Sequence, residues 1–317
     1  MPEASFQRLF HARRGHLRNP YVRDLAWLLD SPDLLDRRQW QGRIATLFSQ
    51  EGEAIDAWLG RLDDDPAELQ ALIERHGFNR LGRYAELLMA HFLRHIGALE
   101  AHGVQVRAAS GETVGEFDFL LRDPSARLLH WEFATKYYLL EAGAGAASAR
   151  TDDLVGPNLA DTLGAKMRKI LERQLNLSQH PAAQAALKET PQGAQALVKG
   201  WLFYAPGEEP LSDKLGVNPA HCRGFWRPLS ELNEMGHDSF LILPRLRWLA
   251  PAQSDPGDCL DHYALAQALK SHFTVDSLPV MVTLMETDEN GAFEIERGFI
   301  VLDDWSRRAA QFVRRAC

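Results

Sequence analysis

The spacing of hydrophobic residues in the first 78 positions is typical of helices. In "NPYVRDLAWLLDSPDLLD" the apolar side chains from Val22 to Leu29 recur three and four residues apart, and the pattern ends at "SPD". Two further helical segments in "EAIDAWLGRLDDDPAELQALIERHG" are separated at "DDDP" and closed by Gly77. We therefore predict an N-terminal helical region over residues 1–78, which would act as a cap or as a surface for a protein partner.

The pattern changes after residue 78 and predicts an α/β core over residues 79–205. The stretch "NRLGRYAELLMAHFLRHIGAL" predicts an amphipathic helix, and "VQVRAA" a short strand. After a hairpin, "ADTLGAKMRKILERQLNLSQH" predicts a helix capped at Asp161 or Thr162, and "ALVKGWLFYA" a buried strand. The order helix, three strands, helix, strand predicts a mixed central sheet flanked by helices. Residues 206–317 alternate strands and loops around one helix, "YALAQALKSHF", which predicts a C-terminal α+β extension packed on the core.

The hairpin is predicted by strict alternation in "GEFDFLLRDPSARLLHWEFATKYYL". Because strand side chains point to alternate faces, Glu116 and Asp118 share one face of the first strand. On the second strand Glu132 and Lys136 share a face with His130. A turn centred on Ser125 places Asp118 directly opposite Glu132, and a slip of one residue would separate them.

Composition and charge narrow the classes of protein. The formal net charge is −8, which argues against a general nucleic-acid coat but permits a local basic groove beside an acidic site. The three cysteines show no paired metal-ligand spacing. No apolar run is long enough to span a bilayer and no signal peptide is evident, so we expect a cytoplasmic protein with no membrane association. Glycine-rich phosphate-binding loops are also missing from the sequence.

Two facing carboxylates need a chemical explanation, because like charges opposite each other destabilise a sheet. A divalent cation removes that repulsion, and Mg²⁺ prefers carboxylate oxygens. The ammonium group of Lys136 could position an attacking water or offset charge on a phosphate oxygen. The alternative is a hairpin whose polar face is simply solvated. The strongly apolar opposite face and the apolar "YYLL" that follows favour a covered strand and therefore a partnered carboxylate pair.

At this point the chain resembles the PD-(D/E)XK nuclease superfamily, in which an acidic helix precedes a three-stranded meander, a helix and a further strand. The resemblance implies a restriction-endonuclease-like core and a metal site made by Glu86, Asp118 and Glu132, with Lys136 as the catalytic lysine. The sequence "EFATK" departs from the superfamily pattern, because Ala134 occupies the expected lysine position. Alternation keeps Lys136 on the same face but about 7 Å further along the strand.

A closer resemblance is to the bacterial family DUF1853, a domain of unknown function grouped with these nuclease-like proteins. It rests on "VRDLAWLLDSPDLL", "LGRYAELL", "GEFDFLL", "WEFATKYYL" and "VGPNLADTLGAKMRKILERQL". These motifs are moderately specific together and weak singly. The family implies a fold and assigns no substrate.

The helix that begins near residue 162 carries a candidate substrate-binding face. Lys166, Lys169 and Arg173 follow one another at helical spacing, and Gln174 stands where the superfamily often keeps a polar residue facing the site. A basic face beside an acidic cluster suits a phosphate backbone. The alternative is the solvated face of an amphipathic helix.

Two hypotheses about function follow. In the first, the protein is a metal-dependent phosphodiesterase that cleaves nucleic acid with Mg²⁺ or Mn²⁺ held by the three carboxylates. In the second, the nuclease-like fold has lost catalysis and serves as a regulatory module that binds nucleic acid or protein. The displaced lysine and the acidic net charge favour the second. A bulge that returned Lys136 to Glu132 would favour the first.

Overall fold

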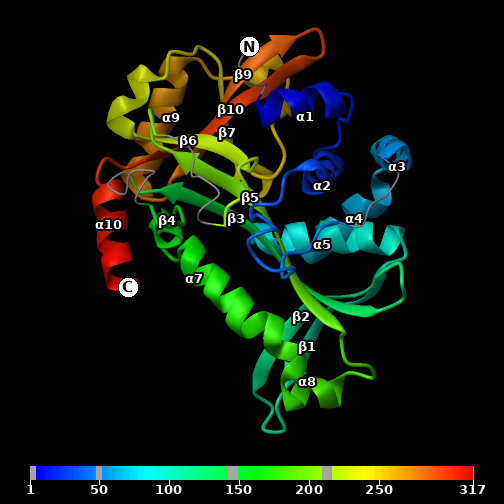
Figure 1. The fold of residues 1–317 in the computed structure, drawn as a ribbon. Coiled ribbons are helices and arrows are strands. Elements are labelled where there is room, and N and C mark those ends of the chain that lie inside the picture. Colours follow the sequence, from blue (N-terminus) through cyan, green and yellow to red (C-terminus); the bar gives the residue numbers. More distant parts are fainter. Residues whose placement is uncertain (1–4, 48–51, 142–148, 209–215, 317) are drawn as a thin grey trace.

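The computed structural model describes residues 5–47, 52–141, 149–208 and 216–316 (Figure 1). Its helices are α1 (Phe6–Arg14), α2 (Pro20–Asp30), α3 (Gly52–Asp64), α4 (Ala67–His76), α5 (Leu81–His95), α7 (Leu163–Arg168), α8 (Pro181–Ala186), α9 (His262–Val275) and α10 (Trp305–Ala316). Its strands are β1 (Leu99–Arg107), β2 (Thr113–Arg122), β3 (Leu128–Leu140), β4 (Leu154–Val155), β5 (Gly193–Tyr204), β6 (Cys222–Pro228), β7 (Phe240–Leu243), β8 (Gln253–Ser254), β9 (Val280–Asp288) and β10 (Gly291–Val301).

The strands form one mixed sheet in the order β1-β2-β3-β5-β6-β10-β9-β7, with β4 paired to β3 and β8 to β10. Strands β3, β5, β6 and β10 run parallel to their neighbours in this series, and the pairs at both ends are antiparallel. The sheet is therefore continuous across the predicted core and the predicted C-terminal extension. A mixed α/β fold with a large central sheet flanked by helices is confirmed; the boundaries at 78 and 205 stay a prediction.

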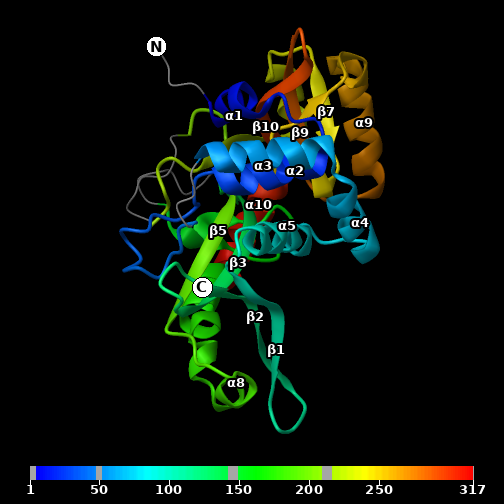
Figure 2. The same ribbon diagram turned by 90° about the vertical axis from the view of Figure 1, so that its right-hand side faces the viewer.

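Helices cover both faces of the sheet (Figure 1). Helices α2 and α5 pack on one face, where Leu197, Trp201 and Phe203 of β5 join their core. Helix α7 packs on the other face with Val198 and Leu202 of the same strand. Both faces of this central strand carry apolar side chains, because helices cover each of them and neither meets water. Figure 2 shows the β1–β2 hairpin extending from the sheet with α8 beside it.

Most local predictions agree with the structure. Helix α4 ends at Gly77, whose φ of 54° is the left-handed conformation that glycine adopts without steric cost. Thr162, one of the two predicted caps, accepts a hydrogen bond from the backbone N–H of Ala165 and begins α7. Cys222 and Cys259 are free, and Cys317 lies outside the described residues. Within the described residues, no helix is both long and apolar enough to cross a membrane.

A buried ion pair ties the C-terminal strands to the segment 248–252. Residues three apart on a regular strand face opposite sides, but a register shift between Glu294 and Glu296 bulges β10 and turns Glu294 and Arg297 to the same side. Both side chains are fully buried, and Arg297 donates two hydrogen bonds to Glu294, of 2.6 and 2.7 Å. The same guanidinium donates to the carbonyl of Ala250 at 2.7 Å, and Glu294 accepts from the N–H of Ala252 at 2.8 Å.

We predict that Glu294→Ala destabilises the fold strongly, because it leaves the buried guanidinium of Arg297 without a counter-charge. Loss of one partner of a buried pair costs about 3–5 kcal/mol. Urea unfolding followed by fluorescence would measure the loss. The matched control is Glu289→Ala in the exposed turn after β9, which should change the unfolding free energy by less than about 0.5 kcal/mol. Equal stability of the two variants would contradict the prediction.

Candidate active site

Helix α5 brings an acidic and a basic side chain to the same edge of the sheet. Glu86 is buried, and both of its oxygens accept from the guanidinium of Arg83 at 3.0 Å. Arg83 also donates to Glu116 of β2 at 2.8 Å, and His102 of β1 lies 2.9 Å from a Glu86 oxygen. Arg83 thus bridges two carboxylates, and this contact raises the pKa of its own guanidinium.

Asp118 stands where β2 and β3 begin to separate. The ladder between these strands pairs Phe119 with Trp131 and Leu121 with Leu129, a register centred on Ser125 as predicted. Continued by one residue, this register places Asp118 opposite Glu132. An Asp118 oxygen accepts a hydrogen bond from the backbone N–H of Phe133 at 2.9 Å. Burial, followed by the negative charge of Glu132, raises the pKa of Asp118 to about 7.

Glu132 is almost completely buried at the centre of β3. One oxygen lies 2.8 Å from Nε2 of His130, and the other accepts from the side-chain amide of Gln174. Burial raises the pKa of Glu132 to about 7, while the positive charge of Lys166 acts in the opposite direction. Burial also lowers the pKa of His130 to about 4, so the imidazole is neutral near pH 7 and donates its Nε2 proton to Glu132.

The carboxyl groups of Asp118 and Glu132 are near enough for each to affect the pKa of the other. A second grouping includes Asp118: one oxygen each of Glu86, Glu116 and Asp118 lie within 4.8 Å of one another. Sequence reasoning did not propose Glu116 as a ligand, although its alternation with Asp118 placed both on one face.

The donor set fits a hard divalent cation. All candidate ligands are carboxylate oxygens, and burial together with the charge of Glu132 raises the pKa of Asp118. Arg83 compensates Glu86 and Glu116, but its side chain is half exposed, so it can turn away into solvent. Glu86, Glu116 and Asp118 could therefore hold Mg²⁺ or Mn²⁺ where α5 meets β2, whereas the predicted ligand Glu132 lies outside this group of oxygens.

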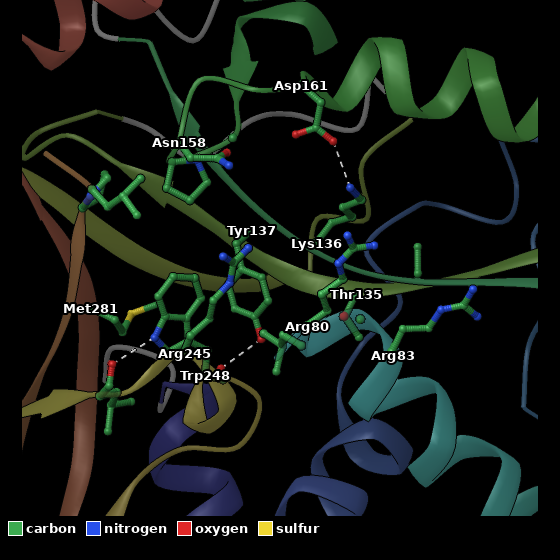
Figure 3. Close-up of a pocket in the computed structure, with 18 of the residues that line it drawn as sticks. Arg80, Arg83, Thr135, Lys136, Tyr137, Asn158, Asp161, Arg245, Trp248 and Met281 are labelled. Carbon is green, nitrogen blue, oxygen red and sulfur yellow. Dashed lines mark hydrogen bonds and ion pairs between the residues drawn. The ribbon is translucent and has the colours of Figure 1, made fainter. Parts of the chain in front are cut away.

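Lys136 does not return to Glu132. The parallel register of β3 with β5 runs without a break from Leu129 opposite Gly193 to Leu139 opposite Phe203, so "EFATK" contains no bulge. Four residues of extended strand separate the two positions by about 13 Å along the chain. The ammonium group of Lys136 instead lies 2.9 Å from the carboxylate of Asp161 (Figure 3).

Lys166 and Gln174 reach the site from the helix that crosses the sheet. After α7 the chain continues through a wider π-helical turn at Lys169–Arg173 and a tighter helical turn at Gln174–Gln179. The wide turn rotates Gln174 back toward Lys166, whose ammonium lies 3.4 Å from its side-chain oxygen. Burial, followed by the positive charges of Lys136 and Lys169, lowers the pKa of Lys166.

The other two residues of the predicted basic face lie elsewhere. Lys169 and Arg173 are exposed, and neither lines the pocket that contains Lys166. A regular α-helix would have kept Lys166, Lys169 and Arg173 on one face, but the π-helical turn changes their relative rotation. Their substrate-binding role stays a prediction.

A pocket of about 760 Å³ begins at these side chains and extends to the C-terminal third. Glu86, Asp118, Lys136 and Lys166 line one part of it. Arg245, Trp248 and Met281 line another part, on the left of Figure 3. The C-terminal strands therefore complete the cavity next to the acidic cluster.

Comparison with family models matches residues 23–301 to the family described as "Domain of unknown function (DUF1853)". The chain belongs to the DUF1853 family. Neither the curated proteins nor the solved structures contain a match to it. The matched region runs from α2 to β10, so the helical N-terminal part and the C-terminal strands belong to the family domain together with the candidate site.

The acid pair of this DUF1853 protein makes its stability depend on pH. Asp118 and Glu132 have pKa values of about 7 in the folded chain, whereas unfolded carboxylic acids titrate near about 4. A carboxyl group whose pKa is raised by folding stabilises the folded chain when it is protonated. This stabilisation is fully present at pH values below the pKa of the group in the unfolded chain. That contribution is lost as pH rises through the folded value, by up to about 1.4 kcal/mol per pH unit for each group.

We expect the free energy of unfolding, measured in EDTA, to fall between about pH 5 and about pH 8. Asp118→Asn removes one ionisation, so this variant should lose less stability over the range and exceed the wild type at the upper end. Urea titrations at several pH values would measure both effects. Glu112→Gln, at an exposed position just before β2, is the control and should behave like the wild type. A wild-type stability that rises with pH would refute the expectation.

Proposed function

We propose that this DUF1853 protein is a metal-dependent phosphodiesterase of the PD-(D/E)XK type that hydrolyses nucleic acid. The supporting observation is the convergence of Glu86, Asp118 and Glu132 from a helix and two adjacent strands, with Lys166 beside them. The surrounding order α5, β1, β2, β3, α7, β5 also follows the superfamily arrangement that the sequence resembles. On this proposal the core around the site is restriction-endonuclease-like and the metal is Mg²⁺ or Mn²⁺.

The acidic and basic side chains of the site have different proposed roles. When bound, a divalent cation supplies Lewis-acid stabilisation to the phosphate oxygens and increases the acidity of water. Asp118 and Glu132 would hold that charge, and His130 with Gln174 fixes both oxygens of Glu132. Lys166 provides the nearby ammonium group that can offset negative charge developing on phosphate.

Lys166 therefore replaces Lys136 as the proposed catalytic lysine. Lys166 lies 3.4 Å from the side-chain oxygen of Gln174, whose amide donates to Glu132, and its positive charge opposes the rise in the pKa of Glu132. Lys136 pairs with Asp161 in the same pocket and is suited to binding a substrate phosphate that displaces this carboxylate. With this assignment a lysine still lies near Glu132, although alanine occupies position 134, where the superfamily has its lysine.

The second candidate is the inactive nuclease-like module. Two observations favour it. "EFATK" contains no bulge that would return Lys136 to Glu132. Arg83 also bridges Glu86 and Glu116 and so neutralises two of the carboxylates that a metal would use. In an active enzyme the cation must displace this guanidinium. In an inactive module Arg83 would be the permanent counter-charge.

Metal binding separates the two candidates. We expect calorimetry at millimolar metal to show Mg²⁺ or Mn²⁺ binding by the wild type and its loss in Asp118→Ala and Glu132→Ala. Glu112→Ala, which removes an exposed acid from the same region, should bind as the wild type does. If the wild type binds no metal, the inactive module becomes the favoured candidate. Binding that survives both substitutions would place the metal elsewhere.

The two lysines can be compared by cleavage of labelled single- and double-stranded DNA and RNA. We expect Lys166→Met to reduce the cleavage rate at saturating substrate by about 10²-fold or more, as for loss of a group acting in the transition state. Lys136→Met should mainly raise KM. The reverse ranking would return the catalytic role to Lys136. Absence of metal-dependent cleavage in every substrate class would count against the phosphodiesterase itself.

A further inference from the structure

The part of the pocket formed by the C-terminal third has a different chemistry from the acidic part. Its lining includes the indole of Trp248, the thioether of Met281, and the apolar side chains of Leu243 and Leu278. Arg245 adds a guanidinium, and Figure 3 shows it beside Trp248. An aromatic surface with adjacent cations suits a planar ligand that carries negative charge.

Trp248 is held in one orientation. Its indole N–H donates to the carbonyl of Leu243 at 3.1 Å, and its own carbonyl accepts from the hydroxyl of Tyr137 at 3.0 Å. The rings of Tyr137 and Phe299 meet it edge-on, with centroids 5.6 and 5.0 Å away. The polar groups of Trp248 are therefore satisfied within the protein, and stacking on the ring would require little loss of side-chain freedom.

Two cations in this pocket are available to a ligand. Arg80, which precedes α5, and Arg245 are both exposed, and among the described residues neither forms an ion pair with a carboxylate. By contrast, Arg83 and Lys136 in the same pocket are held by acids. The guanidinium of Arg245 lies over the Trp248 ring, 5.8 Å from its centre, so a base that stacks on this face must displace the guanidinium, which stays near enough to contact the phosphate of the same nucleotide.

We propose that this part of the pocket is a subsite for an unpaired nucleotide, whose base stacks on Trp248 while its phosphates contact Arg80 and Arg245. The inference rests on the proposed function and specifies its substrate as single-stranded or locally unpaired nucleic acid. A cavity of about 760 Å³ is in the range of small-ligand sites. Bases inside a duplex are covered by their neighbours and present no face to an indole.

Binding of fluorescein-labelled single-stranded oligonucleotides, measured by anisotropy in EDTA, tests the subsite without hydrolysis. Trp248→Ala should weaken binding by about tenfold, whereas Trp248→Phe, which keeps an aromatic face, should remain within about threefold of the wild type. Tyr263→Ala is the matched control, because Tyr263 is 72% exposed on α9 and does not line the pocket. Arg80→Ala and Arg245→Ala should each reduce the salt dependence by about one phosphate contact, unlike Arg38→Ala, at an exposed position outside the pocket.

Tighter binding of the single strand than of the matching duplex, together with the ranking of the Trp248 variants, supports the subsite. Equal affinity of Trp248→Ala and the wild type, preference for the duplex, or no binding by the wild type would each overturn it. These outcomes are distinct from failure of the phosphodiesterase, which is judged by metal-dependent cleavage. A chain that binds single strands through Trp248 and cleaves nothing would keep the subsite and lose the proposed activity.

Discussion

The buried pair of Glu294 and Arg297 is the constraint on which the shape of the pocket depends. A charge inside a protein requires a counter-charge and filled hydrogen bonds, and the carbonyls of Trp248, Leu249 and Ala250 complete the set for Arg297. The same guanidinium lies 4.2 Å from the centre of the Trp201 ring on the central strand β5. Satisfying one buried cation therefore fixes a loop, a strand and the Trp248 side of the pocket together.

A second buried carboxylate fixes the N-terminal helices to the same loop. Asp24 of α2 accepts from the hydroxyl of Tyr84 on α5 at 2.6 Å and from the N–H of Ala250 at 3.1 Å. Arg247 completes its ion pair at 3.3 Å. Helix α5, which carries Glu86, is thereby held relative to the segment that carries Trp248. The N-terminal region thus positions the site.

Within the site, the carboxylates differ in how their negative charge is compensated. Arg83 satisfies Glu86 and Glu116, whereas Asp118 and Glu132 have no guanidinium partner and carry raised pKa values. A divalent cation and a proton are the two species that can relieve this pair. Phosphodiesterase activity requires the divalent cation, whereas a proton would suffice in a module that only binds. The fold accommodates both because Arg83 is half exposed and can leave its partners.

Features that depend on short-range geometry could be predicted from the amino-acid sequence. A turn of a few residues fixes the hairpin register, so the approach of Asp118 to Glu132 followed from alternation alone. Helix ends at Gly77 and Thr162 were equally readable, because capping involves only neighbouring backbone groups. The order of helices and strands along the chain was likewise enough to predict a mixed sheet flanked by helices.

Features that join distant parts of the chain arise from the packing of the elements against one another. Arg83 meets Glu116 across 33 positions, and Gln174 reaches Glu132 across 42. The second of these contacts needs a π-helical turn that hydrophobic periodicity does not reveal. Trp248 joins the pocket only because buried charges from β10 and α2 hold its loop. Such contacts depend on how packed elements satisfy one another's polar groups, and sequence spacing carries no record of that.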